Sequence, residues 1–205
     1  EKNSKLGGLL RYGIPDFKLD KSHIDRRINQ LSEEGIIFHT NVNVGIDISS
    51  DEIISSHDAI ILAGGAEMPR DLPIQGRNFK GIHYAMDFLP QQNRRVSNES
   101  YVNPEEILAT SKNVVVIGGG DTGSDCIGTS IRQGAISVTQ LEIMPEPPEK
   151  EDKLSTWPNW PLKLRTSSSQ EEGANREFSV MTQSFEGDAN GLSLIHISEP
   201  TRRYE

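Results

Sequence analysis

The chain has 205 residues, of which 34% are hydrophobic, and this is enough for a modest core in one or two domains. Its net charge of −9 disfavours nucleic-acid phosphate as a partner, and no apolar run approaches the roughly 18 residues of a membrane span. A single cysteine excludes a disulfide framework and an all-cysteine metal or iron–sulfur site within the chain.

The first third of the chain alternates helical and strand-like segments. Residues 20–35 are predicted to form a helix that ends at Gly35, because apolar residues recur at spacings of three and four. A short helix is expected over 51–56. The apolar runs 36–38 and 59–63 are typical of buried strands, so the pattern predicts an α/β fold with a parallel sheet.

A connecting region is expected between the two halves of the chain. Proline and glycine interrupt it, residues 84–89 favour a short helix, and residues 93–103 are polar enough for a surface loop. Beyond Glu142, five prolines within seventeen residues preclude a long helix.

Residues 113–142 give the clearest pattern. An apolar strand over 114–117 runs directly into three glycines, a helix follows over 122–133, and a second strand is expected over 136–141. Strand, glycine turn, helix and strand within about 30 residues are typical of a βαβ unit.

The glycine turn fits the dinucleotide fingerprint G-x-G-x-x-G in its required context, between a strand and a helix. Gly118 permits the tight turn, Gly120 lets the backbone approach a pyrophosphate, and Gly123 allows close packing of helix on strand. The amide groups at the helix start then favour phosphate. The alternative is a glycine turn of another α/β fold with no coenzyme.

Glu142 ends the second strand, where the fingerprint expects an acidic residue that binds a ribose hydroxyl. Alone, it favours NADH over NADPH, because a carboxylate repels a 2′-phosphate. The alternative is a solvated glutamate at a strand end. Cys126 is predicted to be a buried core residue rather than a redox group.

Five contiguous motifs make the chain resemble the small (β) subunits of glutamate synthase. They are GLLRYGIPDFK (8–18), LAGGA (62–66), MDFLPQQNRR (86–95), GGGDTGSDC (118–126) and TWPNWPLKLRTSSSQ (156–170). The last of these is the most particular to that family.

The resemblance implies two nested dinucleotide-binding (Rossmann-like) domains, both incomplete in this chain. Residues 1–75 would be part of an FAD-binding domain, 76–111 a connector, and 112–192 part of an NAD(P)H-binding domain. Residues 193–205 match nothing in the family and resemble the translation of a sequencing adapter, so we expect a non-native tail.

The family passes electrons from a nicotinamide coenzyme through FAD and 4Fe–4S clusters to a large (α) subunit, which makes glutamate from glutamine and 2-oxoglutarate. The resemblance favours NADPH, with NADH as the other choice, and a cytoplasmic protein with neither membrane nor nucleic-acid partner. Cluster ligands and the first FAD fingerprint are absent from this chain. We therefore expect the fragment alone to be inactive and to hold FAD weakly.

The resemblance also assigns cofactor-binding residues, with no catalytic side chain and no metal ligand among them. The NAD(P)H diphosphate would lie on Gly118, Gly119, Gly120, Asp121, Thr122 and Gly123. A second group would lie beside the flavin: Gly8, Leu9 and Arg11. Another would lie at the strand end where the two domains meet: Ala63, Gly64 and Gly65. A third group would face NAD(P)H: Arg165, Ser167 and Ser168.

Two other functions compete with this assignment. A related NAD(P)H–FAD electron-transfer reductase would share the architecture, and a dinucleotide-binding module that senses redox state would bind coenzyme without catalysis. The segment 157–161 argues for the glutamate synthase subunit, although a packed Pro/Trp loop explains residues 157–160 equally well.

Overall fold

The computed structural model describes residues 1–66, 68–99 and 105–200, with residues 194–200 described by their backbone only. Two compact units divide the chain. The N-terminal unit comprises residues 1–70 and 93–100, and the C-terminal unit comprises 71–92 and 101–205.

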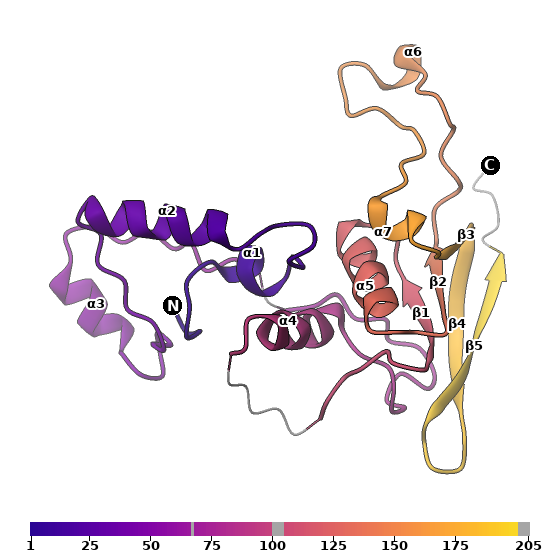
Figure 1. Cartoon of the computed structure of the whole chain (residues 1–205), viewed down its shortest axis with the longest axis horizontal. Helices are drawn as coiled ribbons and strands as arrows, with labels where there is room; N and C mark the ends of the chain where they lie inside the picture. The colour runs from indigo at the N-terminus through magenta and orange to yellow at the C-terminus, as the bar shows by residue number, and fades with distance from the viewer. Residues whose placement is uncertain (67, 100–104, 201–205) are drawn as a thin grey trace. The chain divides into compact units, whose positions relative to one another are not determined.

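Three helices precede residue 57 in the N-terminal unit: α1 (Gly8–Tyr12), α2 (Ser22–Glu33) and α3 (Ser50–Ser56). The predicted helices over 20–35 and 51–56 are thus confirmed (Figure 1). Ile24 is the buried residue of α2, and Gly35 follows that helix at φ +96°, a backbone conformation that glycine adopts readily.

The predicted strands over 36–38 and 59–63 are wrong for this structure. Both segments lie outside every named strand of the described residues. Ile37, Ile61 and Leu62 are 79%, 90% and 94% exposed. An apolar run becomes a strand only where a neighbour pairs its backbone and a second layer covers its side chains.

Helix α4 (Ala85–Val96) is longer than the predicted segment 84–89, because Pro90 lies inside the helix and does not end it. Residues 93–96, predicted as loop, therefore belong to the helix, and residues 100–103 of that predicted loop lie outside the described residues. The division between the two units falls within α4.

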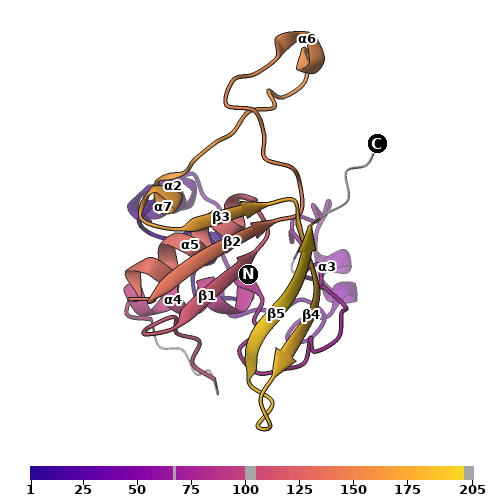
Figure 2. The same cartoon turned by 90° about the vertical axis from the view of Figure 1, so that its right-hand side faces the viewer.

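A parallel sheet forms the centre of the C-terminal unit, in the order β1 (Asn113–Ile117), β2 (Ser137–Glu142) and β3 (Asn175–Phe178). Helix α5 (Asp121–Arg132) connects β1 to β2 and packs on the sheet (Figure 2). The predicted βαβ unit is confirmed. Strand β3 was not predicted, because its sequence NREF is short and polar.

The core of this unit lies between α4, α5 and the sheet. Ile127 of α5 is fully buried, and Leu89 of α4 and Val138 of β2 are 2% and 3% exposed. Apolar burial of this kind is the main source of folding free energy, and here it holds α5 against β1 and β2.

A hairpin of β4 (Val180–Gly187) and β5 (Ser193–Pro200) completes the C-terminal unit. Strand β5 lies in the segment predicted to be a non-native tail, yet its backbone pairs with β4. Residues 201–205 of that segment lie outside the described residues. The origin of the segment stays a prediction.

Between β2 and β3 the chain makes a long excursion that carries α6 (Lys153–Thr156) and ends in α7 (Ser168–Glu171) (Figures 1 and 2). Both helices are short, as the prolines predict. Trp157 and Trp160 are 80% and 77% exposed, so the interpretation as a packed Pro/Trp loop is wrong. The Arg165 guanidinium lies 4.6 Å from the centre of the Trp160 ring.

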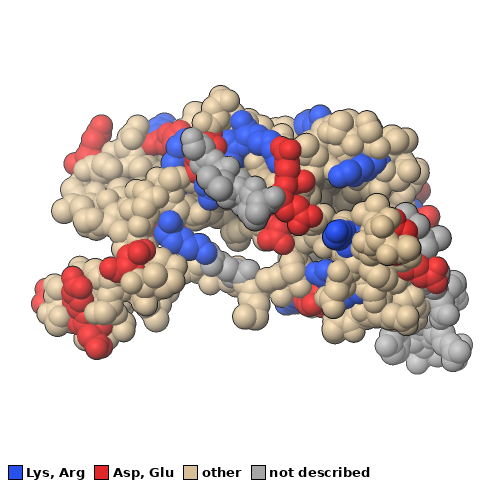
Figure 3. Space-filling view, turned by 90° about the horizontal axis from the view of Figure 1, so that it is seen from below, with Lys and Arg blue, Asp and Glu red and all other residues tan. Residues whose placement is uncertain are grey.

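No helix in the described part of the chain is long and apolar enough to cross a membrane. Acidic and basic side chains both occur on the face shown in Figure 3.

Candidate coenzyme-binding site

The glycine turn lies at the carboxyl ends of two parallel strands. Gly118 follows β1 with φ +122°, and its N–H donates to the carbonyl of Leu141 on β2 over 2.8 Å. Helix α5 begins directly after Gly120. Ligands of open α/β sheets bind outside these strand ends, so the turn has the position that a coenzyme requires.

Open space surrounds two of the glycines. A Cβ placed on Gly118 or Gly120 would meet no atom of the described residues within 4 Å. Gly120 is the N-cap of α5, and no described side chain caps this helix. The amide groups of its first turn are therefore available to an anion, which the helix dipole also favours.

Gly123 has the opposite surroundings. A Cβ at this position would lie 2.5 Å from the Gly118 carbonyl oxygen and 3.3 Å from Nε2 of Gln140. A side chain would therefore push α5 away from the turn. This fits the close packing that the fingerprint expects of its third glycine.

Glu142 lies over the turn at the end of β2. A Cβ on Gly119 would fall 1.4 Å from Oε2 of Glu142, so the carboxyl group covers the space beside Gly119. The other carboxylate oxygen accepts a hydrogen bond from the Met144 N–H over 3.2 Å. A carboxylate here can accept hydrogen bonds from hydroxyl groups and disfavours a nearby phosphate.

Asp121 and Thr122, also predicted at the diphosphate, are exposed in the first turn of α5. The Asp121 carboxylate interacts favourably with the positive end of the helix dipole and so stabilises α5. The structure thus brings all six residues of the turn together with Glu142 in one place.

Gln140 was missed by the sequence analysis. It is 1% exposed on β2, and its Nε2 donates to the Gly118 carbonyl over 2.9 Å. The signal that could have found it is a long polar side chain within an apolar strand, because such a group needs a buried partner.

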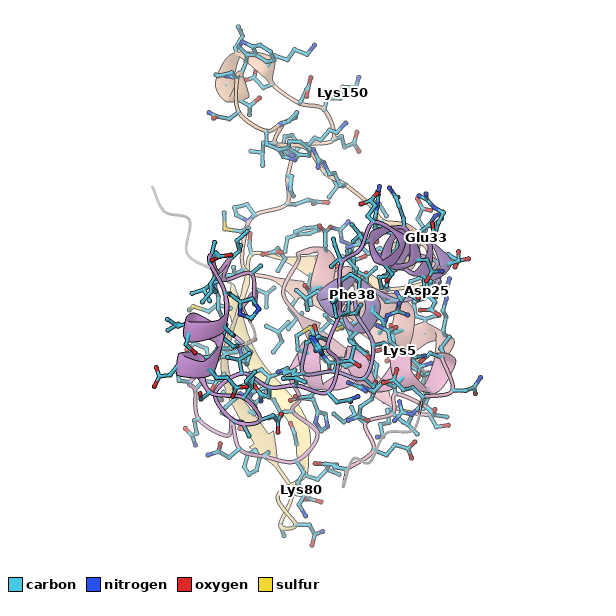
Figure 4. The ribbon with its side chains drawn as sticks, turned by 90° about the vertical axis from the view of Figure 1, so that its left-hand side faces the viewer. Lys5, Asp25, Glu33, Phe38, Lys80 and Lys150 are labelled. Atoms are coloured by element: carbon cyan, nitrogen blue, oxygen red, sulfur yellow. The ribbon has the colours of Figure 1, made fainter. Side chains whose placement is uncertain are left out.

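The flavin-side candidates lie in the N-terminal unit. Leu9 on α1 is 57% exposed, whereas Arg11 is 8% exposed and forms an ion pair with Asp25 of α2, which Figure 4 labels. Gly8 begins α1. Ala63, Gly64 and Gly65 form an exposed segment. In the described structure no backbone hydrogen bond joins this segment to α1.

The third predicted group lies at the start of α7. Ser167 caps α7, and its hydroxyl lies 2.5 Å from the hydroxyl of Ser124 on α5, so this serine does reach the helix of the glycine turn. Ser168 is exposed, and the Arg165 side chain stacks on Trp160.

Cys126 is buried on α5, as predicted. Burial, and to a smaller degree the neighbouring Asp125, raises the pKa of this thiol to about 12. The thiol is protonated at neutral pH and is a core group rather than a nucleophile. Within the residues that the structure describes, no group of three or more His, Cys, Asp or Glu could hold a metal ion.

Parallel strands, a glycine turn with open surroundings and an uncapped helix start are together the features of a dinucleotide-binding fold. Residues 21–159 match the pyridine nucleotide-disulphide oxidoreductase family, and the chain belongs to that family.

Among characterised proteins, the chain is similar to the glutamate synthase [NADPH] small chain of Mycobacterium tuberculosis, with 48% identity over 204 residues. That alignment covers 98% of this chain and 42% of the relative, so the chain spans less than half of the relative's length. The small chain of Bacillus subtilis is 42% identical over 96% of this chain and 41% of its own length. The glutamate synthase [NADH] of Schizosaccharomyces pombe is 45% identical over 93% of this chain and 9% of its own length.

A solved structure shares the fold. FprA of Mycobacterium tuberculosis, in complex with NADPH, superposes with a TM-score of 0.67 at 16% identity, covering 98% of this chain and 61% of FprA. At this identity the likeness concerns the fold alone.

Proposed function

We propose that the chain is part of the electron-input (small) subunit of a glutamate synthase. In that assembly electrons would pass from NADPH through FAD and 4Fe–4S clusters to the large (α) subunit, which forms glutamate from glutamine and 2-oxoglutarate in the cytoplasm. The observation that carries the proposal is the 48% identity, over 98% of this chain, to a glutamate synthase [NADPH] small chain.

The C-terminal unit would bind the nicotinamide coenzyme. The open space at Gly118 and Gly120 supports this assignment, because a side chain at either position would occupy the space that a diphosphate needs. The amides of the turn and of the first turn of α5 would hold the diphosphate. When bound, NADPH supplies a hydride and FAD divides it into single electrons.

The N-terminal unit would bind FAD only as part of a longer chain. Its exposed apolar residues at 36–37 and 60–62 support this view, because such residues need sheet neighbours to become buried. We propose that segments outside this sequence provide those neighbours. On its own the chain is then expected to hold FAD weakly and to be inactive.

The iron–sulfur clusters would lie elsewhere in the subunit. The single cysteine of the sequence is buried in the core with a raised pKa, so it does not suit a cluster. Electron transfer to the large subunit would therefore use parts that this chain does not contain.

For the coenzyme we propose NADPH, which two of the similar small chains carry in their names. Glu142 argues for NADH, which the similar Schizosaccharomyces pombe protein carries in its name. Titration of the protein with each coenzyme decides between the two.

The test uses the intact subunit that contains this chain. Purified with FAD, it is expected to reduce a dye with NADPH and, with the large subunit added, to form glutamate from glutamine and 2-oxoglutarate. Dye reduction without glutamate formation would point to an electron-transfer reductase of another kind. NADPH binding without dye reduction would point to a non-catalytic module, and either result contradicts the proposal.

A further inference from the structure

Three hydrogen bonds connect helix α7 to the glycine turn through two buried glutamine side chains. The N–H of Ser167 donates to Oε1 of Gln170 over 2.8 Å. Nε2 of Gln170 donates to Oε1 of Gln140 over 2.7 Å, and Nε2 of Gln140 donates to the Gly118 carbonyl over 2.9 Å. Gln170 and Gln140 are 7% and 1% exposed. We call this chain of bonds the glutamine relay.

The direction of the relay is fixed at both ends. Ser167 contributes a backbone N–H, which can only donate, and Gly118 contributes a carbonyl, which can only accept. Each amide side chain between them must therefore present its oxygen toward α7 and its nitrogen toward the turn. Turning either amide over would leave buried groups unpaired, which is costly away from water.

The relay also fixes the orientation of one peptide group in the turn. The C=O of Gly118 and the N–H of Gly119 point in opposite directions, because they belong to the same planar trans peptide. By holding the carbonyl, Gln140 directs the Gly119 N–H away from the sheet interior. Glycine has no side chain to restrict this peptide, so the relay supplies the restriction.

Helix α7 is fixed in turn by its own contacts. Ser167 and Gln170 form a capping box, and the Ser167 hydroxyl meets that of Ser124 on α5. The guanidinium of Arg176 on β3 donates to the Arg165 carbonyl just before α7 over 3.2 Å. The relay therefore starts from a firmly held backbone group.

We propose that Gln140 and Gln170 are positioning residues that hold the glycine turn in its coenzyme-binding shape. The end of the excursion between β2 and β3, which carries α7, then determines coenzyme affinity through Gln140. This inference rests on the proposed binding of NADPH at the turn and extends it to a side chain 47 positions beyond Gly123 (170 − 123).

The decisive variant is Gln170→Glu in the intact subunit. A glutamate carboxylate still accepts the Ser167 N–H, as in an ordinary capping box, but cannot donate to Gln140. The Kd for NADPH, measured by calorimetry at pH 8.5, is expected to rise about tenfold, the effect of losing one buried hydrogen bond. The KM for NADPH should rise equally, while kcat at saturating NADPH stays within about twofold.

Gln140→Met gives an independent measurement, because an apolar side chain of similar length cannot hold the Gly118 carbonyl. The expected loss of affinity is again about tenfold. The double variant Gln140→Met/Gln170→Glu should then have the same Kd for NADPH as Gln140→Met alone, since Gln170 acts through Gln140.

Gln91 provides a matched control in the same unit. It is 2% exposed, accepts the Ile107 N–H over 3.1 Å and donates to the Glu105 carbonyl over 3.3 Å. Gln91→Glu removes a buried donor of the same kind at a place outside the glycine turn. It is expected to lower thermal stability and to leave the Kd for NADPH unchanged.

The outcomes separate this inference from the proposed function. If the unchanged subunit binds neither NADPH nor NADH, the proposed function is wrong, and the inference with it. If it binds NADPH and both relay variants bind equally well, only the inference is wrong. The inference is also wrong if Gln91→Glu weakens binding as much as Gln170→Glu, because the loss would then reflect general destabilisation.

Discussion

Replacing Gly120 with alanine should abolish tight coenzyme binding while leaving the fold intact. The backbone at Gly120 has φ −78° and ψ 179°, which alanine adopts without strain, and a Cβ there meets no described atom within 4 Å. The added methyl group would therefore stand in the open space at the start of α5. That space is where the diphosphate must approach the backbone.

The expected size of each effect follows from this geometry. Alanine is a poorer N-cap than glycine, but it also restricts the unfolded chain, and the two effects cancel to within about 1 kcal/mol. For a chain of this size that is a shift in Tm of at most ~4 °C. Losing two charge-assisted hydrogen bonds to phosphate costs about 3 kcal/mol, so the Kd for NADPH should rise ~100-fold.

Gly123→Ala is the contrasting variant. Its Cβ would lie 2.5 Å from the Gly118 carbonyl oxygen, a backbone atom that cannot move alone. Overpacking of this kind costs about 1–3 kcal/mol, so the Tm should fall by roughly 2–10 °C and binding should weaken as well. Gly120→Ala, whose added methyl group meets no described atom within 4 Å, is the comparison for stability.

Thermal melts and NADPH titrations on the same preparations of the intact subunit check both variants. If Gly120→Ala binds NADPH as tightly as the unchanged protein, the diphosphate does not approach the turn and the site is misassigned. If Gly123→Ala is as stable as Gly120→Ala, the close contact between α5 and the turn does not constrain the fold.

Three further predictions concern charged and titratable groups. Glu142→Gln should raise the affinity for NADPH relative to NADH about tenfold, because it removes a carboxylate that repels the 2′-phosphate. If paired titrations give an unchanged ratio of the two Kd values, this prediction is wrong. Cys126, with its pKa raised to about 12 by burial, should react with iodoacetamide at pH 8 about 10³-fold more slowly in the native protein than in urea, and equal rates would contradict the burial. The N–H groups of Leu192 and Asn190 lower the pKa of Asp188 below 3.8. The ionised carboxylate therefore stabilises the β4–β5 turn above about pH 4, and this stabilisation is lost as the pH falls through the lowered pKa. Melting curves between pH 2 and 6 should therefore converge with those of Asp188→Ala at the acid end, and a constant gap would refute this.

The βαβ unit could be predicted because its signals are local. The run VVVI before three glycines specifies β1 and the turn, and the apolar spacing of Ile127 and Ile131 specifies α5. Gly118, Gly120, Gly123 and Glu142 follow from the fingerprint spacing, and the other three turn residues follow from the family resemblance. Their position at the strand ends agrees with the structure, whereas their role in binding stays a prediction.

The differences between the predicted and the observed elements arise from contacts between segments far apart in the sequence. The runs at 36–38 and 59–63 have strand-like sequences, but their backbone finds no sheet neighbour in the described N-terminal unit. Strand β3 is polar and forms because β2 pairs with it. The contact between Gln140 and Gln170 joins residues 30 positions apart, so no local pattern could reveal it.

One oxygen atom sets the spacing of three elements in the C-terminal unit. The carbonyl of Gly118 accepts the amide of Gln140 on β2 and lies against the bare α-carbon of Gly123 on α5. A substitution at position 118, 123 or 140 therefore affects the contacts of the other two. A library meant to alter coenzyme preference should keep that trio constant and randomise position 142, which borders the open side of the turn.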